Sequence, residues 1–383
     1  MTLQSWDFSL LDTGFFRSGQ PFHAGEGGYN RIIGHFPPPM STLQGTIRTA
    51  LAAARGWRPL QSSKLPDGLG DADSLGLLSL RGPYLLWEEK LLFPAPLSVL
   101  IKKIEGNSSL GGEWELRSTH LIPRRRYKCD LGQEVLLPEK KEKLDGAYPP
   151  EKLYLTRTGY STVAGGELVP KDEAFFQDKL WNEEARTGLK RNAATRTAED
   201  RNLYRIVYIR PDYRLKIRVV VEGIPGDWPA LQQQILPLGG EGRLAAVDIN
   251  TITAEDYQKM LPDPPHPQPA TDGVVRYTIS LVTPFPSSSG EQLKELVLKG
   301  PSNAPGKCIS ACIGKPHLYG GWNLEKQVPR PLKPFLPPGS TWFFEAAAED
   351  VEEIKKLHGS LIVDKEASSY GYGQVLIGKW EVE

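Results

Sequence analysis

A basic segment between residues 186 and 218 holds the strongest chemical signal in the sequence. Lysine and arginine at this density contact phosphates with little dependence on base sequence. Tyr204, Tyr208 and Tyr213 are interleaved with the basic residues, and aromatic rings stack on unpaired bases. The segment suits single-stranded nucleic acid, although a solvated basic face has the same composition. Its ten basic residues, opposed by three acids (Glu199, Asp200 and Asp212), are Arg186, Lys190, Arg191, Arg196, Arg201, Arg205, Arg210, Arg214, Lys216 and Arg218.

Two glycine clusters offer another kind of contact. Gly239, Gly240 and Gly242 precede Arg243, and Gly371 and Gly373 flank Tyr372. Glycine permits close approach to the backbone, whose N–H groups can receive phosphate oxygens. A tight turn that serves packing would give the same pattern. Neither cluster has the spacing of a nucleotide-hydrolysing or dinucleotide-binding loop.

Three further arginine-containing stretches are weaker candidates. Gln44 and Arg48 are four residues apart, so an expected helix places them on one stripe, which either contacts a phosphate or is simply solvated. The run Arg124–Arg126, followed by Tyr127 and Lys128, is interpreted as a solvated loop. In strand 214–221, Leu215, Ile217, Val219 and Val221 form an apolar face, while Arg214, Lys216 and Arg218 form a largely basic one.

Enzymatic and metal chemistry find little support in the sequence. The three cysteines include a lone C-x3-C pair, Cys308 and Cys312, which we interpret as small apolar side chains. No cofactor or metal is expected. His35, before the first helix, and His23 are the candidates for acid–base catalysis, but no histidine is paired. Sparse cysteine, a formal charge of +0 and no apolar run of about 20 residues predict a cytoplasmic protein without a membrane span.

The order of expected elements predicts an α+β fold with an internal duplication. Strand, helix, strand, strand, helix and strand in the second half give the ferredoxin-like (RRM-like, βαββαβ) order. The first half repeats it around a large, irregular basic insertion at about 98–202. We therefore expect domains at 1–251 and 252–383, each with a Gly-rich loop, and a linker or solvent loop at 262–269. The second-half elements are 274–282, 292–298, 308–313, 341–346, 349–358 and 374–381; those of the first half are 3–11, 42–55, 77–80, 214–221, 228–236 and 244–249.

Two such units, each with a Gly-rich loop before its last strand, are the plan of the RAMP proteins of CRISPR systems. Within that superfamily the chain resembles subunit three of the type III-B Cmr module, in the Cas-five-like group. Ser18, Gln20 and Asn323 depart mildly from the family pattern. The resemblance rests on six segments in the family's order: FFRSGQPF at 15–22, PMSTLQGTIRTAL at 39–51, ATRTA at 194–198 with LYR at 203–205, LGGEGR at 238–243, GGWN at 320–323 with WFF at 342–344, and GYGQVLIG at 371–378.

The resemblance implies a non-catalytic role in antiviral defence. In this family a β-hairpin "thumb" clamps the 5′ tag of the guide RNA. By that carry-over Lys190, Arg191, Asn192, Thr195 and Arg196 lie at or near its tip. The implied partners are the guide RNA, a large Cas-ten-type subunit and a backbone RAMP subunit, with no membrane. A guide-RNA-processing endoribonuclease and a protein scaffold without RNA contact are the alternatives.

Overall fold

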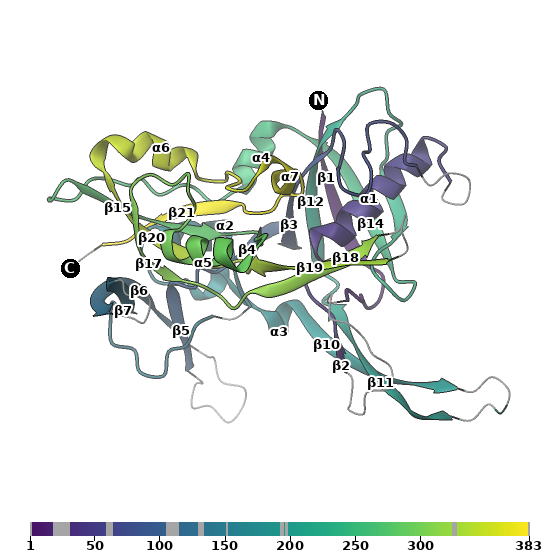
Figure 1. Cartoon of the computed structure of the whole chain (residues 1–383), viewed down its shortest axis with the longest axis horizontal. Helices are drawn as coiled ribbons and strands as arrows, with labels where there is room; N and C mark the ends of the chain where they lie inside the picture. The colour runs from purple at the N-terminus through teal and green to yellow at the C-terminus, as the bar shows by residue number, and fades with distance from the viewer. Residues whose placement is uncertain are drawn as a thin grey trace. The chain divides into compact units, whose positions relative to one another are not determined.

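The structure is a computed structural model that describes residues 2–17, 31–58, 64–104, 115–128, 134–150, 152–191, 195, 198–323 and 328–381. It is an α+β protein, as predicted, and it is built mainly of antiparallel sheets with few helices (Figure 1). Contacts divide it into unit 1 (Met1–Glu89, Asp178–Ala254 and Leu318–Lys333) and unit 2 (Lys90–Gln177, Glu255–His317 and Pro334–Glu383). The predicted domains at 1–251 and 252–383 stay a prediction.

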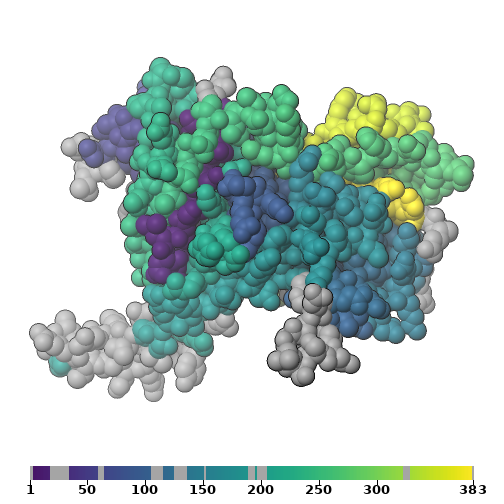
Figure 2. Space-filling view, turned by 180° about the vertical axis from the view of Figure 1, so that it is seen from behind, coloured from purple at the N-terminus to yellow at the C-terminus, as the bar shows by residue number. Residues whose placement is uncertain are grey.

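Unit 1 is organised around an antiparallel sheet with the strand order β13-β14-β1-β12-β3. Figure 2 shows the N-terminal strand in purple beside the green segments of β12 and β14. Helix α1 (Met40–Ala54) contacts β3 and β13 and buries Leu43, Ile47 and Leu51 on one face. The strands are β1 (Thr2–Leu10), β3 (Ser79–Trp87), β12 (Leu215–Ile224), β13 (Gln233–Pro237) and β14 (Leu244–Ile252).

A second sheet of unit 1 carries a long hairpin. β10 (Trp181–Arg191) pairs antiparallel with β11 (Ala198–Pro211), and β11 pairs parallel with β2 (Arg31–Ile33). A short helix α3 (Gln177–Leu180) leads into β10. Figure 1 shows the hairpin extending away from the strands of the larger sheet of unit 1.

The four-stranded sheet of unit 2 has the order β17-β20-β15-β21, with every pairing antiparallel. Alternation along β15 and β20 places Tyr277, Ile279, Trp342 and Phe344 in a core with residues of α5 and α6. The elements are β15 (Val274–Leu281), α5 (Gly290–Lys299), β17 (Lys307–Cys312), β20 (Thr341–Ala347), η2 (Ala348–Asp350), α6 (Val351–Lys356), α7 (Lys365–Ser369) and β21 (Val375–Lys379).

The region predicted to be irregular is mostly strands. β5 (Val99–Ile104), β6 (Glu115–Lys128) and β7 (Glu134–Lys140) form a three-stranded antiparallel sheet. The loop assignment of Arg124–Arg126 was therefore wrong, because these residues lie in β6, where Arg125 and Arg126 pair with Leu137 and Leu136. The other elements here are β4 (Lys90–Pro94), β8 (Leu153–Thr156), α2 (Arg157–Ala164), η1 (Lys171–Glu173) and β9 (Ala174–Phe176).

One further sequence prediction was wrong. Residues 228–236 form no helix: Pro229 has no backbone N–H to donate, and the segment continues into the edge strand β13. The apolar residues that suggested a helix have other roles, since Arg55 lies 4.4 Å from the Trp228 ring centroid and Ile235 is exposed.

The proline-rich stretch at 262–269, predicted as a linker or solvent loop, is a loop that is anchored at its start. It follows α4 (Ala254–Met260), and Arg157 Nε donates to the Leu261 carbonyl at 2.7 Å while His358 bonds the Pro262 carbonyl at 2.8 Å. The remaining strands are β16 (Phe285–Pro286), β18 (His317–Asn323) and β19 (Val328–Leu336). No helix within the described ranges is long and apolar enough to cross a membrane.

Candidate nucleic-acid interface

The basic segment of the sequence becomes the β10–β11 hairpin and the start of β12. Thr187 lies opposite Arg205, and Arg31 of β2 lies beside Arg205 on the other side. Arg205 and Thr195 are exposed. Lys190 and Arg191 lie in β10, but their side chains fall outside the described part of the structure, as do Asn192 and Arg196 altogether. The thumb-tip assignment therefore stays a prediction.

Acids from elsewhere in unit 1 neutralise much of the charge at the hairpin base. Glu184 accepts from Arg186 and from Arg210, each with a closest contact of 2.6 Å. Asp12 accepts from Arg210 at 3.0 Å and from Arg243 at 2.9 Å. Hydrogen bonds from Arg210 and Arg186 lower the pKa of Glu184, and the Thr13 backbone followed by Arg210 lowers that of Asp12. We call these five side chains, Asp12, Glu184, Arg186, Arg210 and Arg243, the base network.

Tyr208 belongs to the packing of the hairpin base. The guanidinium carbon of Arg186 lies 4.8 Å from its ring centroid and that of Arg243 lies 4.6 Å away. The Phe15 ring is 5.5 Å away, and Tyr208 is buried. The expectation that Tyr208 stacks on RNA bases is therefore not supported. Tyr213 is 88% exposed, so its ring is accessible for stacking on a base. The Tyr204 side chain lies outside the described residues.

The first glycine loop packs on the Phe15-Phe16 motif. Gly240 N donates to the Phe15 carbonyl at 2.9 Å. Gly239 has a φ of +82°, and a Cβ added there would lie 2.5 Å from the same carbonyl oxygen, so only glycine fits. Gly242, with a φ of +63°, has open space around it. The loop thus combines a packing role at Gly239 with an accessible backbone at Gly242, next to Arg243 of the base network.

The second glycine loop, in unit 2, is a packed turn. Gly371 and Gly373 are buried, with φ of +73° and +68°. Gly371 N donates to the Ser368 carbonyl and Gly373 N to the Pro284 carbonyl, both at 2.9 Å. Because these donors are already used, the loop resembles the packing alternative more than a phosphate cradle. Its assignment to RNA binding remains a prediction.

Arg48 does not lie on an exposed stripe of α1. It is buried, and its guanidinium donates to Gln44 Oε1 at 3.0 Å and to the Asp71 carbonyl at 2.6 Å. The contact joins α1 to the loop before β3. Gln44 and Arg48 therefore act in packing here, and RNA contact by either stays a prediction.

The basic face of β12 is paired with acids on neighbouring strands. Arg218 makes two contacts of 2.6 Å to Asp7, and its side chain is 12% exposed, against 5% for Asp7. Lys216 lies 3.5 Å from Asp248, and Arg214 binds Asp212 at 2.9 Å. Strand β1, which supplies Asp7, lies between β12 and β14 in the sheet. Each of the three cations of this face is therefore paired with an acid of unit 1.

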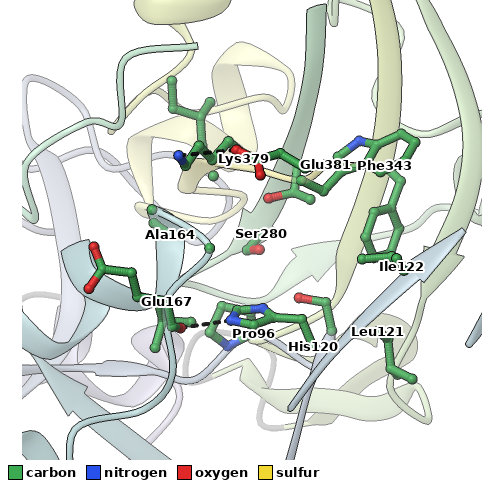
Figure 3. A pocket seen from close by; sticks show the side chains of 18 of the residues that line it. Pro96, His120, Leu121, Ile122, Ala164, Glu167, Ser280, Phe343, Lys379 and Glu381 are labelled. Atoms are coloured by element: carbon green, nitrogen blue, oxygen red, sulfur yellow. Dashed lines mark hydrogen bonds and ion pairs between the residues drawn. The ribbon is translucent and has the colours of Figure 1, made fainter. Parts of the chain in front are cut away.

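A cavity of about 250 Å³ in unit 2 is lined in part by His120. Figure 3 shows His120 bonded to the Glu167 carbonyl, at 2.7 Å, and Lys379 with Glu381 on the opposite side of Ser280. Burial, with a smaller effect of Lys141, lowers the pKa of His120. The cavity is smaller than the roughly 300–1,000 Å³ of ligand pockets, so it has no room for an RNA strand.

Two half-buried histidines of unit 2, His120 and His358, predict a loss of stability in mild acid. Burial lowers the pKa of His120 and His358 below the ordinary 6.5. Nδ1 of His358 accepts from Ile377 N at 3.3 Å, a bond that protonation removes. Below about pH 6.5 the unfolded chain binds protons that the folded chain does not bind. The free energy of unfolding therefore has its full value above that pH and decreases below it.

We therefore expect the unfolding temperature to fall between about pH 7 and pH 5.5 in thermal melts. A variant carrying His120→Gln and His358→Gln is the control, and its decline over the same range should be smaller. An equally steep decline in both proteins would show that other groups are responsible.

Metal chemistry gains no support from the described residues. Within them, no group of three or more His, Cys, Asp or Glu side chains is placed to hold a metal ion. Burial raises the pKa of Cys308 to about 11 and that of Cys312 to about 12, so both thiols are protonated at neutral pH. His35 packs against Tyr319 at 5.6 Å, and His23 lies outside the described residues.

Antiparallel sheets, few helices and a protruding basic hairpin define an α+β protein with a candidate surface for single-stranded nucleic acid. The chain belongs to the CRISPR-associated protein (Cas_Cmr3) family, whose model matches residues 8–380. This finding confirms the resemblance drawn from the sequence motifs.

Two solved structures resemble nearly the whole chain. A chain in the cryo-EM structure of the Type III-B Cmr-beta bound to cognate target RNA is 14% identical with a TM-score of 0.52, covering 97% of this chain and 96% of that one. A chain in the structure of the Type III-B Cmr-beta bound to cognate target RNA and AMPPnP, state 1, is also 14% identical. Its TM-score is 0.50, and the match covers 98% of this chain and 99% of that one. At this identity the likeness shows the fold. No curated protein matches the chain.

Proposed function

We propose that the chain is a non-catalytic RAMP subunit of a type III-B CRISPR effector complex. In this role it binds the 5′ tag of the guide RNA and links the large Cas-ten-type subunit to the backbone RAMP subunit, in antiviral defence. The observation that carries the proposal is the β10–β11 hairpin, which presents the basic segment away from the unit 1 sheet (Figure 1). Family membership and the Cmr-beta structures with cognate target RNA support it.

The duplicated ferredoxin-like architecture is part of the proposal. In unit 2 the chain order β15, β17, β20, β21 becomes the sheet order β17-β20-β15-β21, and in unit 1 β1, β3, β12, β14 become β14-β1-β12-β3. Both are the 4-1-3-2 arrangement of a split βαβ unit, read from one edge or the other. Unit 1 has strand β13 where unit 2 has its second helix. The strand orders support a duplication with one helix lost.

A direct RNA assay tests the proposal against its two alternatives. The pure chain incubated with tag-bearing RNA should retain the RNA in a salt-sensitive manner and leave it intact, because His35 packs against Tyr319 and His120 bonds the Glu167 carbonyl in a small cavity. Cleavage that disappears in His35→Ala or His120→Ala would indicate an endoribonuclease. A lack of both retention and cleavage would indicate a protein scaffold.

The proposed link to the large subunit predicts a stable heterodimer. This prediction is based on the family resemblance at residues 15–22 and 342–344. The contact surface itself must lie elsewhere, because the aromatic side chains of these segments are buried in the fold: Phe15, Phe16, Trp342 and Phe344. Co-expression and gel filtration at micromolar concentration should give co-elution. Separate peaks would contradict this part of the proposal.

A further inference from the structure

We propose that Asp12 and Glu184 restrain RNA binding at the hairpin base by holding three arginines in ion pairs. This inference rests on the proposed function and concerns the same surface. Each acid bridges two arginines: Glu184 joins Arg186 to Arg210, and Asp12 joins Arg210 to Arg243. Three cations against two anions leave a net charge of +1 on the base network.

The geometry lets a phosphate reach the same arginines. The side chains of Arg186, Arg210 and Asp12 are 43%, 48% and 48% exposed, and Glu184 is 33% exposed. A carboxylate and a phosphate compete for the same guanidinium N–H groups, since each presents two oxygens that can accept charge-assisted hydrogen bonds. Arg243 Nε is also buried without a hydrogen-bond partner among the described residues. The arginines are thus positioned for an oxyanion but occupied by carboxylates.

Stability gives little reason for these acids to be present. Solvent-exposed ion pairs contribute about 0–1 kcal/mol to folding, and often nothing measurable. RNA affinity responds more strongly, because it depends on how many cations release counterions when phosphates replace them. Arginines that are paired with the protein's own acids cause fewer counterions to be released from the RNA. Asp12 and Glu184 therefore lower the effective number of phosphate contacts, and this lowers the affinity of the hairpin base for RNA.

The decisive experiment is salt-dependent binding of a single-stranded RNA of arbitrary sequence to the full chain. Asp12→Asn with Glu184→Gln adds two net positive charges. The slope of log K against log salt for single strands is about 0.7 per phosphate contact, so it should steepen by about 1.4, and binding should tighten about fifteenfold at about 0.15 M salt. Each single variant should give about fourfold, which keeps a readout if the double variant does not fold.

A matched control carries Glu295→Gln and Glu352→Gln, which add the same charge on unit 2. Both acids are exposed and paired with a lysine, Lys299 and Lys355 respectively. Its affinity and slope should stay at wild-type values, and thermal melts should show all variants folded. Wild-type binding that is unchanged or weakened by the Asp12 and Glu184 variants overturns this inference but leaves the proposed function. No RNA binding by wild type or any variant overturns both.

Discussion

Replacing Lys190, Arg191 and Arg196 together with alanine is expected to weaken binding of a tag-bearing RNA by roughly fiftyfold at about 0.15 M salt. Each phosphate contact contributes about 0.7 to the single-strand salt slope, so the slope should fall by about 2. Folding should be intact, because exposed basic residues shift stability by no more than about 0.5 kcal/mol. Titrations of RNA at several salt concentrations, with a thermal melt of each variant, measure both quantities.

The matched control is Arg124, Arg125 and Arg126 changed together to alanine. These three substitutions remove the same charge from β6 of unit 2, where Arg124 is exposed. We expect this variant to bind with near wild-type affinity and slope. If it loses binding while the hairpin variant keeps it, the RNA site lies on the β5–β7 sheet and the thumb assignment is wrong.

Arg218→Ala is expected to lower the free energy of unfolding by about 3–5 kcal/mol, because it leaves the Asp7 carboxylate buried without its cation. The two side chains are only 12% and 5% exposed and share two contacts of 2.6 Å. Lys216→Ala is the control: its pair with Asp248 is 31% and 41% exposed, and its loss should cost less than about 1 kcal/mol. Denaturant unfolding compares them.

The two variants also separate charge from structure in RNA binding. If the basic face of β12 held RNA, Arg218→Ala and Lys216→Ala would each reduce affinity in the folded state. We expect neither to do so, since both cations are committed to acids of the same sheet. A strong affinity loss in folded Lys216→Ala would restore the face as an RNA site.

Strand and helix order could be predicted wherever the apolar period was clear. The period-two pattern of β12 and of β15 gave correct strands, and the 42–55 helix has the spacing that buries Leu43, Ile47 and Leu51. The helix predicted at 228–236 was wrong because the helical spacing of Trp228, Leu231 and Ile235 does not determine where each side chain packs. There, a cation–π contact and an exposed edge strand replace a helix face.

The charge of the candidate site could not be predicted from local sequence. Residues 186–218 contain ten basic residues and three acids, but Asp7, Asp12, Glu184 and Asp248 all lie outside that window. Asp7, Asp248 and Glu184 reach Arg218, Lys216 and Arg210 because β1, β14 and β10 lie close to β12 or β11 in the fold, and Asp12 reaches Arg210 from the segment after β1. Counting charge along the chain omits partners that pairing between strands supplies.

The central claim, that the hairpin holds guide RNA, is tested most directly by cross-linking. A tag-bearing guide RNA cross-linked to the protein by ultraviolet light and digested gives peptides that mass spectrometry can assign. The account predicts cross-linked peptides from residues 186–205, and their loss when Lys190, Arg191 and Arg196 are alanine. Cross-links confined to 115–140 of unit 2, unchanged in that variant, would contradict it.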